Sequence, residues 1–187
     1  MSSAGALLLA PGAGADRNHH TLVAVEAVMA PMPTVRMDFP SRKAGRRSPD
    51  RAPVAVAAVV EEAGHLVGSA RIRANRLALG GRSFGGRMCS LAVAAGLPAA
   101  GLVLLSYPLH PPGKPDNLRI DHFESIDVPC LFIGGLKDPF GTPDEFDEHT
   151  RRIAGGVTQV WLPGGHDPRN CDEVIASEVR KWLATLR

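Results

Sequence analysis

Aromatic side chains and cysteines are both scarce in this chain. Only 5% of its 187 residues are Phe, Tyr or Trp, and its three cysteines are Cys89, Cys130 and Cys171. The cysteines are odd in number, widely spaced and without a C-x-x-C pair, which argues against a disulfide framework and against a zinc site. A reducing cytoplasm is therefore the expected compartment, and Cys89 is expected to pack in the core.

A large excess of charge and long apolar runs are also missing. The formal net charge of +2 at pH 7 is too small to indicate a nucleic-acid partner. No apolar stretch approaches the roughly 20 residues that a membrane-spanning helix needs, and the short run 6–10 has neither the length nor the preceding basic residue of a signal peptide. We expect a single globular domain over residues 1–187, with no nucleic-acid or membrane partner and an oligomeric state left open.

Basic residues cluster in one segment that is also rich in proline, glycine and serine. Its members are Arg42, Lys43, Arg46, Arg47 and Arg51. Charge runs without interleaved aromatic residues are usually solvated surfaces, so a solvated loop is the favoured interpretation. An anion-binding patch is the alternative.

Short apolar runs alternate along the chain with longer stretches compatible with helices. This pattern predicts an α/β fold, a three-layer sandwich in which a mostly parallel sheet of about six strands carries helices on both faces. The expected strands are residues 6–10, 34–39, 75–80, 101–106, 129–134 and 158–162. The expected helices are residues 18–30, 53–70, 87–95, 143–154 and 172–186.

The segment Gly81-Arg82-Ser83-Phe84-Gly85 has the pattern G-x-S-x-G and lies between an expected strand and an expected helix. A nucleophilic serine needs its hydroxyl held clear of the backbone at a sharp strand-to-helix turn, and the flanking glycines leave room for that turn. The pattern therefore indicates a nucleophile at Ser83. The plainer alternative is a serine in a glycine-rich turn.

An acid and a histidine follow Ser83 at the ends of later strands. Asp138 comes after the strand expected at 129–134, and His166 comes after the strand expected at 158–162. A serine hydroxyl needs a histidine to accept its proton and an acid to orient that histidine, and the carboxyl ends of parallel strands share one edge of the sheet. Asp138 and His166 are thus the predicted partners of Ser83. Asp144 is the reserve acid, and ordinary turn residues are the alternative interpretation of both.

Three segments in this order resemble the α/β-hydrolase superfamily, and within it the small lidless hydrolases related to dienelactone hydrolase. The segments read G-R-S-F-G-G-R at 81–87, L-S-Y-P-L-H-P-P at 105–112 and G-L-K-D-P-F at 135–140. More narrowly, the chain is similar to a family of poorly characterised bacterial hydrolases that is also related to an animal chromatin-complex subunit. The resemblance covers nearly the whole chain. It implies a minimal core without a cap domain, without the two strands that usually precede residue 6, and with a shallow, open site.

The resemblance also implies where an oxyanion would be stabilised. The fold places one donor at the backbone N–H of Phe84, the residue after the nucleophile. Similarity to the family's loop after the first strand places the second donor at Ala13, with Gly14 as the alternative. Pro11 stands where many relatives have histidine. Neither a metal nor an organic cofactor is required for this chemistry.

Residues near the expected elbow are candidates for a substrate pocket. Tyr107, Leu109 and His110 follow the fourth expected strand, and we expect them to form one wall of an acyl or leaving-group pocket. Arg82 precedes the nucleophile and either holds an acidic substrate group or forms a structural ion pair. His19 and His20 either rim the pocket or lie in an exposed turn.

These observations favour a serine hydrolase of the carboxylesterase or thioesterase type. It would cleave a small ester or thioester of a small-molecule acyl substrate through a Ser-His-Asp triad and an acyl-enzyme. The alternative is a non-catalytic protein-interaction module on the same fold, since a fold does not fix function. A third interpretation keeps the fold but changes the reaction, for example to a haloperoxidase-like or lyase activity.

Overall fold

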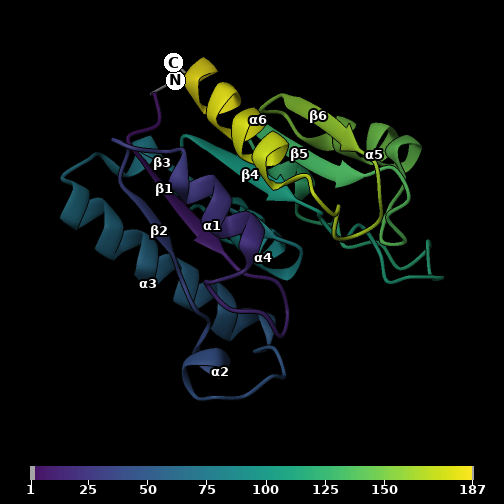
Figure 1. Cartoon of the computed structure of the whole chain (residues 1–187), viewed down its shortest axis with the longest axis horizontal. Coiled ribbons are helices and arrows are strands. Elements are labelled where there is room, and N and C mark those ends of the chain that lie inside the picture. Colours follow the sequence, from purple (N-terminus) through teal and green to yellow (C-terminus); the bar gives the residue numbers. More distant parts are fainter. Residues whose placement is uncertain (1–2, 187) are drawn as a thin grey trace.

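A six-stranded parallel sheet forms the centre of the computed structural model, which describes residues 3–186 (Figure 1). The strand order across the sheet is β2-β1-β3-β4-β5-β6, and every neighbouring pair is parallel. The strands are β1 (Ala6–Ala10), β2 (Thr34–Arg36), β3 (Leu77–Arg82), β4 (Gly101–Leu105), β5 (Cys130–Gly135) and β6 (Val157–Leu162). This arrangement confirms the predicted α/β class and the number of strands.

Helices cover both faces of the sheet. In Figure 1, α1 and α6 lie on the face toward the viewer, whereas α3 and α4 lie behind it. The α-helices are α1 (His20–Ala27), α2 (Pro40–Lys43), α3 (Ala52–Ala70), α4 (Phe84–Ala94), α5 (Pro143–His149) and α6 (Asp172–Thr185). Short 3-10 turns lie at Ala74–Arg76, Phe123–Ser125 and Thr150–Arg152.

Alternation of side chains along the central strands builds two separate apolar cores. In β1, Leu7 and Leu9 belong to the core under α1 and α6, whereas Leu8 belongs to the core under α3 and α4. Successive strand residues point to opposite faces, so a strand covered on both sides must be apolar at every position. This requirement explains the uninterrupted apolar runs that the sequence shows at the strands.

The outer helices bury one stripe each. In α6 the buried residues include Ile175, Val179, Trp182 and Leu183, whose spacing follows the helical period of 3.6 residues. Val174, at the start of the helix, is exposed, so the buried stripe begins at Ile175.

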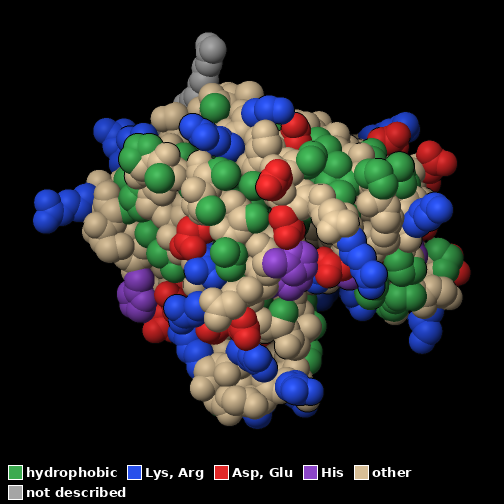
Figure 2. Space-filling view, in the orientation of Figure 1, with side chains coloured by type: hydrophobic (Ala, Val, Ile, Leu, Met, Phe, Trp, Pro, Cys, Tyr) green, Lys and Arg blue, Asp and Glu red, His purple; other side chains and the backbone are tan. Residues whose placement is uncertain are grey.

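The basic segment differs from the expected loop in two respects. Part of it forms the short helix α2, and β2 ends at Arg36, so residues 37–39 are not in the sheet. Three of its five basic side chains are paired with acids: Arg42 with Asp16 at 2.9 Å, Lys43 with Glu62 at 2.9 Å and Arg46 with Asp50 at 3.7 Å. Blue and red side chains accordingly lie next to each other around α2 (Figure 2).

The connection between β4 and β5 contains no inserted domain in the described chain. Between Leu105 and Cys130 its regular structure is the single 3-10 turn Phe123–Ser125. The expected absence of a cap domain therefore agrees with the structure. Within residues 3–186, no helix has both the length and the apolar character that crossing a membrane requires.

Candidate active site

Ser83 occupies a strained turn between β3 and α4. Its backbone has φ 49° and ψ −115°, a conformation that non-glycine residues rarely adopt. A Cβ atom at Gly81 or at Gly85 would collide with the carbonyl oxygen of Ala10 at the end of β1. Glycine is therefore required on both sides of the serine, because only a chain without side chains at these points can turn so close to the neighbouring strand.

Ser83, His166 and Asp138 form a continuous hydrogen-bonded chain. The Ser83 Oγ lies 2.9 Å from His166 Nε2, and His166 Nδ1 lies 2.8 Å from Asp138 Oδ2. If Nδ1–H donates to the carboxylate, Nε2 is left to accept the serine proton. The structure thus brings together the three residues that the sequence singled out, from the ends of β3, β5 and β6.

Asp138 is held in place from two sides. Its side chain is only 3% exposed, and its Oδ1 accepts a hydrogen bond of 2.9 Å from the backbone N–H of Phe140. The ring of Phe140 lies against the ring of His166, with 4.1 Å between centroids. The reserve acid, Asp144, lies instead in the exposed first turn of α5.

Arg82 holds the loop that carries His166. Its Nη2 lies 3.0 Å from the carbonyl oxygen of His166, to which it donates a hydrogen bond, and 3.0 Å from the carboxylate of Asp167. The Arg82 side chain is 13% exposed. Of the two roles foreseen for Arg82, this geometry favours the structural ion pair, which ties the residue before the nucleophile to the residue after the histidine.

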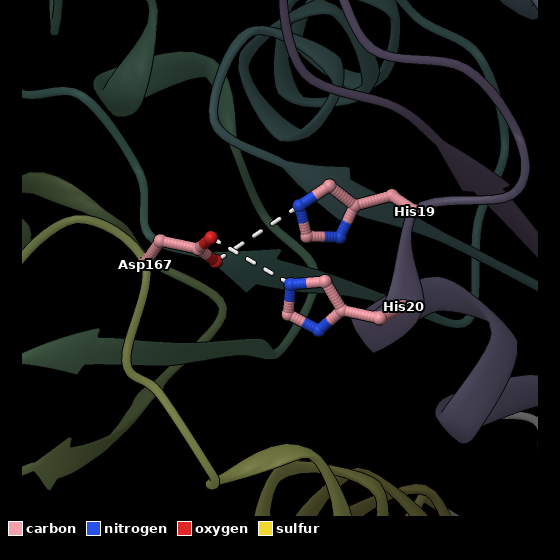
Figure 3. Close-up of side chains that lie close together, drawn as sticks. All are labelled: His19, His20 and Asp167. Atoms are coloured by element: carbon pink, nitrogen blue, oxygen red, sulfur yellow. Dashed lines mark ion pairs between the residues drawn. The ribbon is translucent and has the colours of Figure 1, made fainter.

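His19 and His20 meet Asp167 beside this pair (Figure 3). Their Nε2 atoms lie 3.9 Å and 3.6 Å from the Asp167 carboxylate, and the two rings stack with centroids 4.3 Å apart. His20 Nδ1 also lies 2.6 Å from Asp172 Oδ2 at the start of α6. The two histidines therefore join the His166 loop to the beginning of both α1 and α6.

The charges around Asp167 are predominantly positive. Burial favours a higher pKa for Asp167, but Arg82 and then His19 and His20 outweigh it, so the pKa of this carboxyl lies below its ordinary value. Burial, followed by Arg82 and His20, lowers the pKa of His19. Asp167 is thus held ionised next to a mostly neutral His19.

Three such side chains together are also a possible metal-ligand set, and the hydrogen bonds test that possibility. The backbone N–H of Thr21 donates to His19 Nδ1 at 3.4 Å, so a neutral His19 carries its proton on Nε2. That atom faces Asp167 and would have to lose the proton to bind a metal. Because Arg82 already neutralises Asp167, the cluster fits an ion-pair network better than a cation site.

The loop after β1 lies against Ser83. An ideal Cβ on Gly12 would be 3.8 Å from the Ser83 Cβ, which places the following residue, Ala13, beside the elbow. Within the described part of the chain, the backbone N–H groups of Ala13 and Phe84 are not used in the hydrogen bonds of turns, loops or caps. Both expected oxyanion donors are therefore available near Ser83.

The proposed pocket wall needs correction. Tyr107, Leu109 and His110 are 2%, 0% and 5% exposed, so their side chains turn into the protein and do not border an open surface. The Tyr107 hydroxyl donates to the carbonyl oxygen of Arg119, and His110 lies 3.2 Å from Glu145. These side chains fill the interior, because the connection after β4 folds back over the sheet.

Sequence reasoning did not identify Asp167 as part of the site. Its signal was its position directly after His166, with Arg82 directly before Ser83. A single aspartate or a single arginine in such a position is common on a protein surface. Cys89 is fully buried, as predicted, and burial raises the pKa of its thiol to about 12, so it is not a competing nucleophile.

This fold, with a Ser-His-Asp chain at the carboxyl ends of its strands, is that of an α/β hydrolase. A family model described as "Alpha/beta hydrolase domain" matches residues 3–178, and the chain belongs to that family. A comparison with curated proteins found no match.

Solved structures of hydrolases share the fold. Est1E from Butyrivibrio proteoclasticus with bound ferulic acid has a TM-score of 0.78 and 14% identity, over 98% of this chain and 90% of that one. Dienelactone hydrolase from Anabaena variabilis has a TM-score of 0.76 and 17% identity, over 100% and 88%. The type II thioesterase BorB, from the borrelidin biosynthetic cluster, has a TM-score of 0.70 and 16% identity, over 98% and 94%. At these identities the likeness concerns the fold.

Proposed function

We propose that this protein is a serine hydrolase that cleaves a small ester or thioester through an acyl-enzyme. The observation that carries the proposal is the hydrogen-bonded chain from Ser83 through His166 to Asp138 at a strained elbow. The fold similarity to an esterase, a dienelactone hydrolase and a thioesterase supports hydrolysis of a small acyl compound.

In the first half-reaction Ser83 Oγ attacks the acyl carbon of the substrate. As the new C–O bond forms, His166 Nε2 takes the hydroxyl proton, and the carbonyl π electrons move onto the oxygen. The N–H groups of Phe84 and Ala13 would donate hydrogen bonds to that oxyanion, and Asp138 would stabilise the imidazolium. The tetrahedral intermediate then expels the alcohol or thiol, which leaves with the proton from Nε2.

In the second half-reaction water replaces the leaving group. His166 Nε2 accepts a proton from the water as its oxygen attacks the acyl carbon, and the second tetrahedral intermediate expels Ser83 Oγ. Nε2 returns the proton to Oγ, and the carboxylic acid is released. The histidine must serve both steps without moving, which is the role we assign to Asp138 and to the Arg82 contact with the His166 loop.

Labelling with a fluorophosphonate probe tests the nucleophile. The native protein should be labelled at one residue, located by mass spectrometry as Ser83, and Ser83→Ala should not be labelled. Ser90→Ala is a matched control, because Ser90 Oγ also lies 2.8 Å from a histidine, His122, but Ser90 is completely buried. This variant should label like the native protein.

Absence of labelling in folded native protein would contradict the proposal. It would favour the alternative function, a non-catalytic interaction module on a hydrolase fold. Labelling that survives in Ser83→Ala would contradict the assignment of Ser83 itself. Circular dichroism of each variant confirms that the fold is retained in either case.

A further inference from the structure

A second group of basic side chains lies one helical turn after the nucleophile. Arg87 belongs to the first turns of α4, and its backbone N–H donates to the carbonyl oxygen of Ser83 at 3.1 Å. The side chain is half-buried, and its Nε atom is buried without a hydrogen-bond partner in the described structure. A buried donor on a charged group that lacks a partner is costly, so this atom needs an explanation.

The connection between β4 and β5 brings two more basic residues to the same helix. The hydroxyl of the buried Tyr107 donates to the Arg119 carbonyl oxygen at 2.9 Å, and His122 Nε2 lies 2.8 Å from Ser90 Oγ on α4. Ser90 Oγ itself donates to the Arg87 carbonyl oxygen, so it accepts from His122. The contact with Ser90 fixes His122 beside α4, and the contact with Tyr107 fixes the backbone of Arg119.

The two arginines of this group lack acidic partners. Among the described residues, neither Arg87 nor Arg119 forms an ion pair, in contrast to Arg42, Lys43 and Arg46. Burial first, and then repulsion from Arg87, lowers the pKa of Arg119 and lowers that of His122 to about 4. The exposed Asp121 acts on His122 in the opposite direction but is outweighed.

We propose that Arg87 and Arg119 form an anion-binding site that receives the carboxylate or phosphate group of an acidic acyl substrate. Partly buried guanidinium groups are stabilised by an anion that accepts their hydrogen bonds, and their planar donor sets match carboxylate and phosphate oxygens. Arg87 follows Ser83 by four residues, which is about 6 Å along an α-helix, so the proposal concerns a substrate whose acid group lies at about that distance from its acyl carbon. The assignment of the anion to a substrate rests on the proposed hydrolase function.

Binding of simple anions tests the site without any catalysis. Isothermal titration of glutarate and, separately, of inorganic phosphate into the native protein should show binding that weakens as the salt concentration rises. The two probes distinguish a carboxylate site from a phosphate site. Arg87→Gln and Arg119→Gln should each weaken binding of the preferred anion by about tenfold or more. Arg180→Gln, an exposed residue of α6 on the opposite face of the sheet, is the matched control and should bind like the native protein.

Two esters of equal chain length test the link to the substrate. One is the 4-nitrophenyl monoester of adipic acid, with a free carboxylate, and the other is 4-nitrophenyl hexanoate, which is neutral. The ratio of kcat/KM for the acidic ester to that for the neutral ester should fall about tenfold in Arg87→Gln and in Arg119→Gln. Arg87→Lys should retain part of the ratio, and Arg180→Gln all of it.

The outcomes separate this inference from the proposed function. If neither anion binds the native protein, or if the ratio is unchanged in both arginine variants, the anion site is wrong even when Ser83 is labelled. If neither ester is hydrolysed and Ser83 is not labelled, the hydrolase function fails, and titration still decides whether the arginines bind an anion. Thermal unfolding of Arg87→Gln and Arg119→Gln shows that each variant folds.

Discussion

Two arginines flank Ser83, and their surroundings differ. Arg82, directly before the serine, is paired with Asp167 and donates to the carbonyl oxygen of His166. Arg87, one turn after the serine, has no ion pair in the described structure and repels Arg119 and His122. Arg82, whose partners come from the protein, holds the His166 loop in place. Arg87 lacks such partners, and its guanidinium group is therefore the one that we propose binds a ligand. Burial alone does not distinguish the two residues; the partners do.

The largest effect should follow the loss of Arg82. Arg82→Gln removes the ion pair and the hydrogen bond that hold the His166 loop, so we expect kcat/KM for a neutral ester to fall about 100-fold, because small displacements of a catalytic base are costly. The rate of fluorophosphonate labelling should fall in parallel. Arg82→Lys, which keeps the charge but lacks the planar guanidinium group, should recover part of both rates. Rates within twofold of those of the native protein would show that the His166 loop keeps its position without the Arg82 contacts.

A double-mutant cycle sharpens this prediction. If Arg82 acts through Asp167, then Asp167→Asn should also slow labelling, and the double variant should be little worse than Arg82→Gln alone. Additive effects would mean that Arg82 acts through the His166 carbonyl only. His166→Gln serves as the reference for complete loss of the base.

The free energy of unfolding should change with opposite sign at the two arginines. In Arg82→Gln the Asp167 carboxylate loses the positive charge that balances it, so we expect the free energy of unfolding to fall by about 1–2 kcal/mol. Arg87→Gln removes a repulsion from Arg119 and should change stability by at most a gain of roughly 0.5 kcal/mol. Urea unfolding monitored by circular dichroism measures both. A loss above about 1 kcal/mol in Arg87→Gln would indicate that Arg87 has a structural partner.

Histidine pKa values report each arginine separately. Arg87→Gln should raise the pKa of His122 from about 4, because the protonated ring loses a nearby positive charge, although burial remains. Arg82→Gln should raise the pKa of His19 for the same reason. Proton NMR titration follows both rings, and each variant is the control for the other. An exchange of the two responses would contradict the placement of the charges.

The pH dependence of stability also reports the two neighbourhoods separately. His122 has a pKa of about 4 in the folded protein and an ordinary value of 6.5, so the unfolded chain takes up its proton first as the pH falls. Stability should therefore decrease from pH 6.5 toward pH 4, by roughly 1 kcal/mol after allowance for solvent screening. His122→Gln should reduce this slope.

The carboxyl group of Asp167 acts in a lower pH range. Its pKa in the folded protein is below the ordinary 3.8, so its contribution is complete above that value and is lost as the pH falls through the folded pKa. Asp167 also raises the pKa of His19, which lies below 6.5, so Asp167→Asn should lower that pKa further and steepen the slope below pH 6.5. An unchanged slope would mean that His19 is not linked to Asp167.

The hydrogen-bonded chain of a serine, a histidine and an acid could be predicted because local rules decide most of it. Ser83 stands between glycines at a strand-to-helix turn, and Asp138 and His166 follow later strands of a parallel sheet. The carboxyl ends of such strands meet at one edge, so chain order places the three side chains together. The strands and helices are recognisable in the sequence because the period of each element decides which of its positions are buried and must be apolar.

The neighbourhood of the triad could not be predicted in the same way. Tyr107, Leu109 and His110 stand close to the elbow in the fold, but the side-chain directions depend on how an irregular connection packs. The ion pair between Arg82 and Asp167 joins two residues that are 85 positions apart in the sequence. No periodic pattern marks such contacts, because loop residues obey neither the helical nor the strand repeat.

The sequence by itself determined the α/β class, the parallel sheet and the identity of the serine, acid and histidine. These features depend on short-range constraints: apolar runs for strands covered on both faces, and glycines where the turn passes against β1. Only the tertiary structure decided that Arg82 is paired and Arg87 is not, and that the residues after β4 fill the interior. Charge compensation and burial are sums over distant neighbours, and those neighbours are defined only once the chain has folded.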